Sequence, residues 1–146
     1  MTAPDIFVGN LQRKIRVNVA GLQDFAAKAV REALQLNKAK NTDLRKLHEV
    51  FVWLISDRRM ASLHRKFMRQ TGPTDVLTFQ HGEIFISVET ANRHARSFRN
   101  SLESELCLYV VHGLLHLNGF DDQTQTGARK MEKMQERILH NYRSTL

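Results

Sequence analysis

The segment from Leu102 to Gly119 constrains the fold of this chain more than any other, because it is apolar around nearly the whole circumference of a helix. Such a helix has no face suited to water, so the rest of the chain is expected to pack around it. Asn100 is predicted to cap its first turn, with Glu103 reaching back in a capping box. Gly119 is predicted to end the helix, because glycine readily adopts the left-handed conformation that reverses the chain.

Strand-like and helix-like patterns alternate along the rest of the chain. Strands are predicted at residues 15–19, 50–55, 76–80 and 83–88, and His81 with Gly82 has the composition of a tight hairpin turn between the last two. Further helices are predicted at about 25–33, 60–67, 89–98 and 124–142. With the helix that ends at Gly119, these patterns predict an α+β domain of about four strands and about five helices.

The length of 146 residues predicts a single domain over residues 1–146, since the chain has no internal repeat and no linker-like composition. Cys107 is the only cysteine and cannot form an internal disulfide. No apolar run approaches the roughly 18 residues of a membrane span, and none follows a basic start as in a signal peptide. These features predict a cytoplasmic protein with no membrane partner.

The charge balance favours a polyanionic partner. The chain has 22 Lys and Arg residues against 15 Asp and Glu residues, which gives a formal net charge of +7. Cations that neutralise phosphates release condensed counterions, and this release favours binding to nucleic acid. A basic protein that binds no nucleic acid fits the charge alone equally well.

Two histidines on the buried helix are candidate metal ligands. His112 and His116 stand four residues apart, so both imidazoles lie on the same face of the helix, one turn apart. Asp122 follows Gly119 by three residues, where the reversed chain can return a third ligand. Three protein ligands with a fourth position open to water are typical of a catalytic zinc site. The carboxylate oxygen also makes manganese or magnesium possible.

Each of these residues also has a purely structural interpretation. A histidine on an apolar face is often a hydrogen-bonded core residue, although two at this spacing before a glycine favour a metal. Asp122 has Gln125 three positions later, so it could instead cap the last helix. Asp121 is the alternative ligand if Asp122 is the cap.

The residue after the first histidine separates two classes of metal-dependent hydrolase. The ligand spacing of this chain is zincin-like. Zincin metalloproteases, however, place a glutamate directly after the first histidine as general base, and that position here is Gly113. Proteolysis is therefore disfavoured. A phosphodiester hydrolase needs a metal and cations for the phosphate. Candidate RNA-binding cations are Arg58, Arg59, Arg65 and Lys66, followed by Arg93, Arg96 and Arg99 at three-residue spacing. A solvated outer face is the structural alternative for the second group.

Three motifs resemble those of the YbeY endoribonuclease family: the stretch from Pro73 to Phe79, the stretch from Gly82 to Ser87, and the stretch from His112 to Asp121. The similarity extends over nearly the whole chain. It implies a small mixed sheet and a metal-dependent endoribonuclease that acts on single-stranded RNA, with its metal, usually zinc, on three histidines. It also implies a part in 3′-end maturation of the 16S-type ribosomal RNA of the small ribosomal subunit, and in ribosome quality control.

The chain departs from this family pattern at two positions. The family's third histidine falls at Asp122, so the resemblance supports His112 and His116 directly and Asp122 by position. The family arginine that is thought to contact the RNA phosphate falls at Met68, and Arg69 follows one residue later as the candidate catalytic cation. These departures support an alternative interpretation, a ribosome-associated RNA-binding factor whose catalysis is weak or lost.

Overall fold

A mixed four-stranded sheet and six helices make up the part of the chain that the computed structural model describes, residues 2–68 and 75–144. The elements in chain order are β1 (Asp5–Asn10), α1 (Val19–Gln35), α2 (Asp43–Lys46), β2 (Glu49–Ile55), α3 (Asp57–Met68), β3 (Val76–Phe79), β4 (Glu83–Ser87), α4 (Val88–Ser97), α5 (Leu102–Leu117) and α6 (Gln125–Ser144). The predicted α+β class with a mixed sheet is confirmed. The short helix α2 makes six helices in place of about five.

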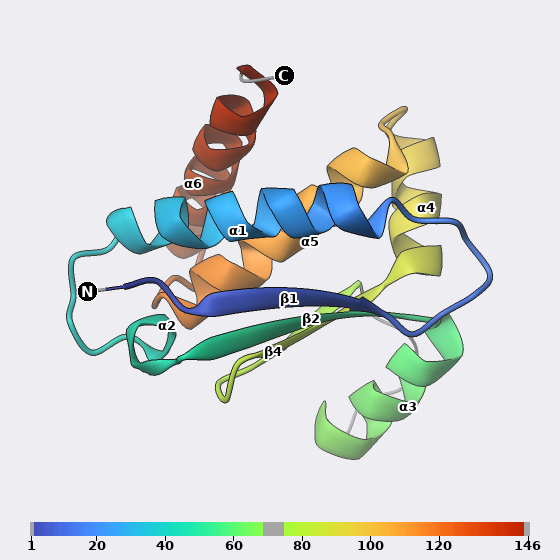
Figure 1. The fold of residues 1–146 in the computed structure, drawn as a ribbon, viewed down its shortest axis with the longest axis horizontal. Coiled ribbons are helices and arrows are strands. Elements are labelled where there is room, and N and C mark those ends of the chain that lie inside the picture. Colours follow the sequence, from blue (N-terminus) through green and yellow to red (C-terminus); the bar gives the residue numbers. More distant parts are fainter. Residues whose placement is uncertain (1, 69–74, 145–146) are drawn as a thin grey trace.

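The sheet has the strand order β1-β2-β4-β3. β1 pairs with β2 and β2 with β4 in parallel, whereas β3 runs antiparallel to β4 and forms one edge. Alternate residues of each strand point to the face that α1 and α5 cover, as Val50, Val52 and Ile84 show by being fully buried. Figure 1 shows α1 and α5 on one side of the sheet and α3 on the other side, near one end.

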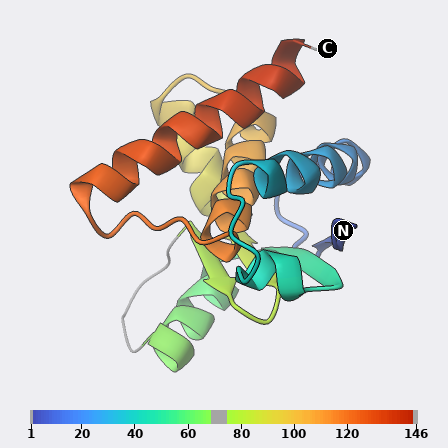
Figure 2. The ribbon, with the colours of Figure 1, turned by 90° about the vertical axis from the view of Figure 1, so that its left-hand side faces the viewer.

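Helix α5 occupies the centre of the molecule, as its composition predicts. Figure 2 shows it enclosed by α1, α4 and α6, and Leu114 and Leu115 have no exposed surface. Gly113 faces the sheet, where an added Cβ would come within 2.8 Å of the Ile84 side chain. The glycine therefore permits a close approach of α5 to β4, and residue 113 does not face the histidine side of the helix.

The predicted strand at 15–19 is wrong, and the first strand is β1 instead. The segment before α1 has its backbone groups engaged locally: the Gln12 amide donates to the Ile15 carbonyl over 2.7 Å and accepts from the Ile15 N–H over 3.0 Å. Asn18 then caps α1 by accepting from the Gly21 N–H. Residues 15–19 do alternate between apolar and polar, but the backbone groups of Ile15 and Gly21 bond to the side chains of Gln12 and Asn18 rather than to a neighbouring strand.

The predicted cap of α5 is one residue out of place. Ser101 is the N-cap, and its Oγ accepts from the Ser104 N–H over 3.1 Å. Asn100 donates its side-chain amide to Glu105 instead, over 3.3 Å. Serine and asparagine cap helices about equally well, so the composition of this segment did not decide between them.

No helix among the described residues combines the length and the apolar composition needed to cross a bilayer.

Candidate metal centre

The two histidines of α5 converge on one point. The ring centroids of His112 and His116 lie 4.6 Å apart, and the ring planes make an angle of 82°. Their Nε2 atoms are only 3.0 Å apart. The spacing of four residues therefore brings two ring nitrogens together, as the sequence predicts.

The other nitrogen of each ring already has a partner. His112 Nδ1 lies 2.6 Å from Oε1 of Gln135, which projects from α6. His116 Nδ1 lies 3.1 Å from the backbone carbonyl oxygen of Phe120. Both partners are hydrogen-bond acceptors, so they favour the tautomer with the proton on Nδ1. This arrangement orients both rings and directs the Nε2 lone pairs toward a shared ligand.

A sharp turn after α5 brings the Asp122 carboxylate back toward the two histidines. Gly119 has φ +93°, in the region that glycine adopts without a steric penalty. The preceding Asn118 is fully buried and fixes the end of the helix: it donates to the Ala33 carbonyl over 2.8 Å and accepts from the Thr42 hydroxyl over 2.8 Å. The turn is thus fastened to α1 and to the segment before α2.

Asp122 completes the cluster. Its two carboxylate oxygens lie 3.6 Å from His112 Nε2 and 3.8 Å from His116 Nε2. Ligand bonds of about 2.0–2.2 Å at tetrahedral angles separate neighbouring ligand atoms by roughly 3.3–3.6 Å. The three separations bracket this range, so the residues present fit a small divalent ion. The Asp122 side chain is 46% exposed, which leaves one side of the cluster open to solvent.

The electrostatics suit a metal ligand. Burial lowers the pKa of His116, and the adjacent His112 lowers it further, against the opposing effects of Asp122, the Phe120 carbonyl and Asp121. His116 is therefore neutral at physiological pH, with a lone pair free on Nε2.

The interpretation of Asp122 as a helix cap is wrong. Thr124 precedes α6, and its Oγ accepts from the Gly127 N–H over 3.0 Å. Asp121, the alternative ligand, accepts from the Gln123 N–H over 3.0 Å. Among the described residues, only His112, His116 and Asp122 form a group of three or more side chains whose ligand atoms lie close enough for a metal.

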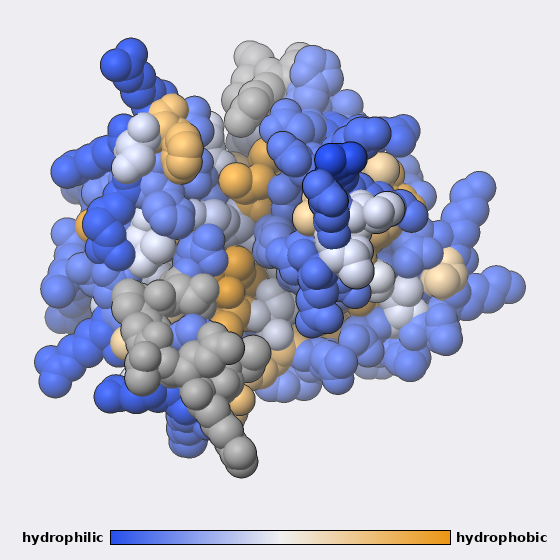
Figure 3. All heavy atoms as spheres, turned by 180° about the vertical axis from the view of Figure 1, so that it is seen from behind, coloured by the Kyte–Doolittle hydropathy of each residue, from blue (hydrophilic) through white to orange (hydrophobic). Residues whose placement is uncertain are grey.

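The cluster opens into a cleft with a volume of about 610 Å³, lined on one side by β3 and on the other by the end of α5 and the loop after it. Figure 3 views the molecule from behind and shows apolar side chains gathered in a band between two hydrophilic sides. The apolar part of the cleft wall includes Val76, Leu117 and Phe120. The histidines therefore face an open, partly apolar cleft rather than a closed core.

The predicted RNA-binding cations fall into two groups. The α3 group is exposed and consists of Arg58, Arg59, Arg65 and Lys66. Arg93 on α4 is engaged with Asp57, with Nη1 2.7 Å from the carboxylate. Burial alone would raise the pKa of Asp57, but hydrogen bonds from Arg93, Ser87 and Thr90 hold that pKa below its usual value.

Arg93, Arg96 and Arg99 do not share one helical face. Arg93 and Arg96 lie on α4, which ends at Ser97, and Arg99 lies beyond it with φ +56°. The predicted helix at 89–98 thus runs one residue too far, and the three-residue spacing holds only for the first two arginines. Arg69, the predicted catalytic cation, lies outside the described residues.

Sequence reasoning missed the partners of the two histidines. Gln135 carries one visible signal, because it is a polar residue on the apolar stripe of α6 between Met131 and Ile138. The backbone carbonyl of Phe120 carries none, since only the fold brings it to His116.

Comparisons with known proteins relate this chain to one family. A family model described as "Endoribonuclease YbeY" matches residues 7–143. A Chlamydia trachomatis serovar D protein named Endoribonuclease YbeY is 31% identical over an alignment 148 positions long, which covers 92% of this chain and 86% of that protein. A Myxococcus xanthus protein of the same name is 34% identical over an alignment 104 positions long, which covers 62% of this chain and only 35% of that protein. The solution structure of TM1509 from Thermotoga maritima aligns with a TM-score of 0.63 at 28% identity, over 96% of this chain and 93% of that one.

Proposed function

Since this chain belongs to the YbeY endoribonuclease family, we propose that it is a metal-dependent hydrolase that cleaves single-stranded RNA internally. One observation carries the proposal: two histidine Nε2 atoms and a carboxylate converge at an open cleft in a chain of net charge +7. Three protein ligands with an open side are typical of catalytic rather than structural sites.

His112, His116 and Asp122 would hold the divalent ion. When bound, such an ion polarises a phosphate oxygen and makes a water molecule a stronger nucleophile. The contacts of Gln135 and of the Phe120 carbonyl keep the protons of both imidazoles on Nδ1, so both Nε2 atoms remain available as ligands. Zinc suits two imidazoles, and the Asp122 carboxylate extends the choice to manganese or magnesium.

We place the substrate in ribosomal RNA, with 3′-end maturation of the 16S-type RNA and quality control of the small ribosomal subunit as the cellular role, in the cytoplasm. The family membership supports this role, and the exposed cations of α3 support a polyanionic substrate. Arg69 is proposed to contact the RNA phosphate in place of the family arginine lost at Met68, and residues 1–146 are proposed to form a single functional domain.

One departure from the family favours a second candidate. Asp122 stands where the family has a third histidine, and this change supports an RNA-binding factor of the ribosome whose catalysis is weak or lost. That factor would keep the fold and the basic helix α3 while the metal centre no longer supports hydrolysis.

A cleavage assay separates the two candidates. End-labelled single-stranded RNA and a matched duplex are incubated with the full chain after zinc, manganese or magnesium is supplied. We expect cleavage of the single strand alone, and a loss of at least about 100-fold in His116→Ala and Asp122→Ala. Asp121→Asn is the matched control, since this neighbouring carboxylate accepts from the Gln123 N–H in the loop and is not one of the three converging ligands. Binding of RNA without cleavage in any metal would favour the binding factor.

A further inference from the structure

Three aromatic rings lie together at the edge of the metal cleft, on elements that supply none of the three candidate metal ligands. Phe67 lies on α3, Phe79 ends β3, and His81 lies in the turn between β3 and β4. Phe67 is 53% exposed, although it is a large apolar residue, and the His81 side chain is 65% exposed. We refer to Phe67, Phe79 and His81 as the aromatic shelf.

The rings of the shelf form a continuous series. The centroids of Phe67 and Phe79 lie 5.4 Å apart, with the ring planes at 76°. Phe79 and His81 lie 5.6 Å apart, with nearly parallel planes at 20°. Phe79 thus joins the two exposed rings, and each of these keeps part of its surface in solvent.

Neighbouring side chains hold the shelf in place. Glu83 accepts from Trp53 Nε1 over 2.7 Å and lies 2.6 Å from His81 Nε2, so it ties the turn to β2. Phe79 also packs edge-on against Phe85 of β4, with centroids 5.7 Å apart. Contacts with β2 and β4 therefore hold Phe79 and His81 in place, which reduces the entropy lost when a flat ligand stacks on them.

The shelf has a cationic border. Lys66 Nζ lies 5.4 Å from the centroid of the Phe67 ring, and Arg65 is exposed next to it in the chain. After Asp57, helix α3 contains no acidic residue. Aromatic rings beside cations, at the end of a basic helix, match the two parts of a nucleotide: a flat base and a charged phosphate.

The shelf is continuous with the metal cleft. Phe79 and Gln80 line the same cleft as His112 and His116. A single-stranded RNA that passes the histidines and continues across β3 therefore reaches the rings. In a duplex each base is already stacked and paired, so only an unpaired nucleotide can offer its face to a protein ring.

We propose that the aromatic shelf is a base-stacking subsite for unpaired nucleotides next to the scissile bond, with Lys66 as a contact for the adjoining phosphate. The proposal rests on the proposed function, because the strand on the shelf is the RNA that the metal centre cleaves. It supplies a physical basis for a preference for single strands, since a duplex cannot occupy the shelf.

The test measures binding separately from cleavage. Fluorescence anisotropy follows a labelled single-stranded 12-nucleotide oligouridine on the full chain, with and without EDTA, and a gel monitors its integrity. Phe67→Leu removes the ring and keeps an apolar side chain. Phe98→Leu is the matched control, because Phe98 is 73% exposed after α4 and has no ring contact among the described residues.

We expect Phe67→Leu and His81→Ala each to weaken binding about five-fold or more, with the salt dependence unchanged. Lys66→Gln should instead reduce the slope of log affinity against log salt by roughly one. An oligomer with abasic positions should bind wild type more weakly and be insensitive to Phe67→Leu. Phe98→Leu should bind as wild type does.

Two results would overturn the subsite: wild-type affinity in both Phe67→Leu and His81→Ala, as expected if the rings serve a protein partner, or an equal loss on the abasic oligomer. The test distinguishes failure of the subsite from failure of the proposed function. Ring-dependent binding without cleavage in any metal would support the shelf and reject the hydrolase. Cleavage of the single strand with unchanged affinity in both variants would reject the shelf alone.

Discussion

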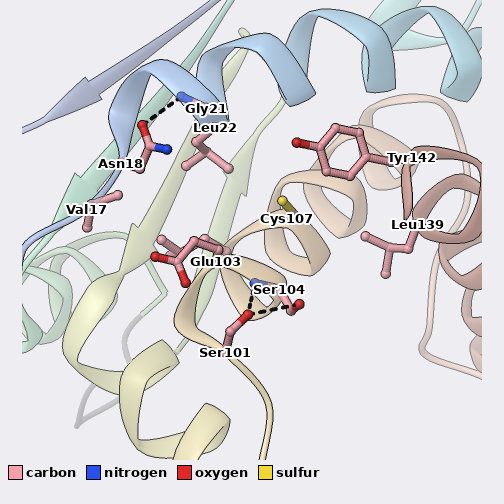
Figure 4. A pocket seen from close by; sticks show the side chains of 11 residues that line it. Val17, Asn18, Gly21, Leu22, Ser101, Glu103, Ser104, Cys107, Leu139 and Tyr142 are labelled. Atoms are coloured by element: carbon pink, nitrogen blue, oxygen red, sulfur yellow. Dashed lines mark hydrogen bonds between the residues drawn. The ribbon is translucent and has the colours of Figure 1, made fainter. Parts of the chain in front are cut away.

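The two ends of α5 each border an opening, and only one of them has the character of a reactive site. At the C-terminal end, His112 and His116 face a broad cleft that is open to solvent. At the N-terminal end, a smaller pocket of about 250 Å³ lies between the starts of α1 and α5 and the end of α6. Figure 4 shows Cys107 and Tyr142 among the side chains around this pocket.

The polar groups of the two openings are used differently. In the N-terminal pocket, Asn18 accepts from the Gly21 N–H over 3.0 Å and Ser101 accepts from the Ser104 N–H over 3.1 Å, as Figure 4 shows. These groups satisfy the ends of two helices. In the metal cleft, the Nδ1 atoms of His112 and His116 are hydrogen-bonded to Gln135 and to the Phe120 carbonyl, and their Nε2 atoms face each other 3.0 Å apart.

The comparison shows that enclosure alone does not mark a functional site. The smaller pocket is bounded by three helices, yet the Asn18 and Ser101 side chains in its wall already accept hydrogen bonds from the first turns of α1 and α5. In the wider cleft, the fold directs the Nε2 lone pairs of His112 and His116 to one point. We expect substitutions at the two ends of α5 to separate metal binding from stability.

The largest effect is expected in the buried packing of α5 itself. Leu114 is fully buried near the C-terminal end of α5, between the two histidines, so Leu114→Ala should lower the free energy of unfolding by about 2–5 kcal/mol, through lost burial and a residual cavity. Urea denaturation measures this loss. Leu108→Ala, at a partly buried position of the same helix, is the control and should cost less. A loss confined to one end of α5, seen by hydrogen exchange, would show that the two ends are independent.

A smaller effect is expected at the partner of His112. Gln135→Leu removes the acceptor for Nδ1, so metal affinity should fall about 10- to 100-fold, while the fold is retained. Competition with a chromogenic chelator measures the affinity. Gln125→Leu makes the same change at an exposed position of α6 and should leave the affinity unchanged. Equal affinities in all three proteins would mean that Gln135 does not orient His112.

The smallest effect is expected in the N-terminal pocket. Cys107→Ala changes a buried side chain on the wall of that pocket, so it should lower stability by about 1 kcal/mol and change metal affinity less than two-fold. The same chelator competition and a urea titration check both values. A ten-fold change in metal affinity would contradict the separation of the two ends.

The sequence predicted the C-terminal site better than its surroundings. His112, His116 and Asp122 lie within 11 positions of one another, and helix periodicity with a glycine stop was enough to bring them together. Gln135 and the Phe120 carbonyl reach the histidines only through the packing of α6 and the turn, which local patterns do not specify. β1 was missed for a related reason: Ile6, Phe7 and Val8 form a short apolar run without the alternation that Ile15 and Val17 show, and it is the pairing with β2 that makes this segment a strand.

The central claim is that the C-terminal end of α5 is a three-ligand metal site, and elemental analysis tests it most directly. Protein purified without a metal-affinity tag is compared with His116→Ala, Asp122→Ala and the control Asp121→Asn. We predict about one equivalent of a divalent transition metal in wild type and in the control, and loss of most of it in the other two variants. A wild type that holds no metal after zinc or manganese is supplied, or an Asp122→Ala variant that keeps a full equivalent, would contradict the account.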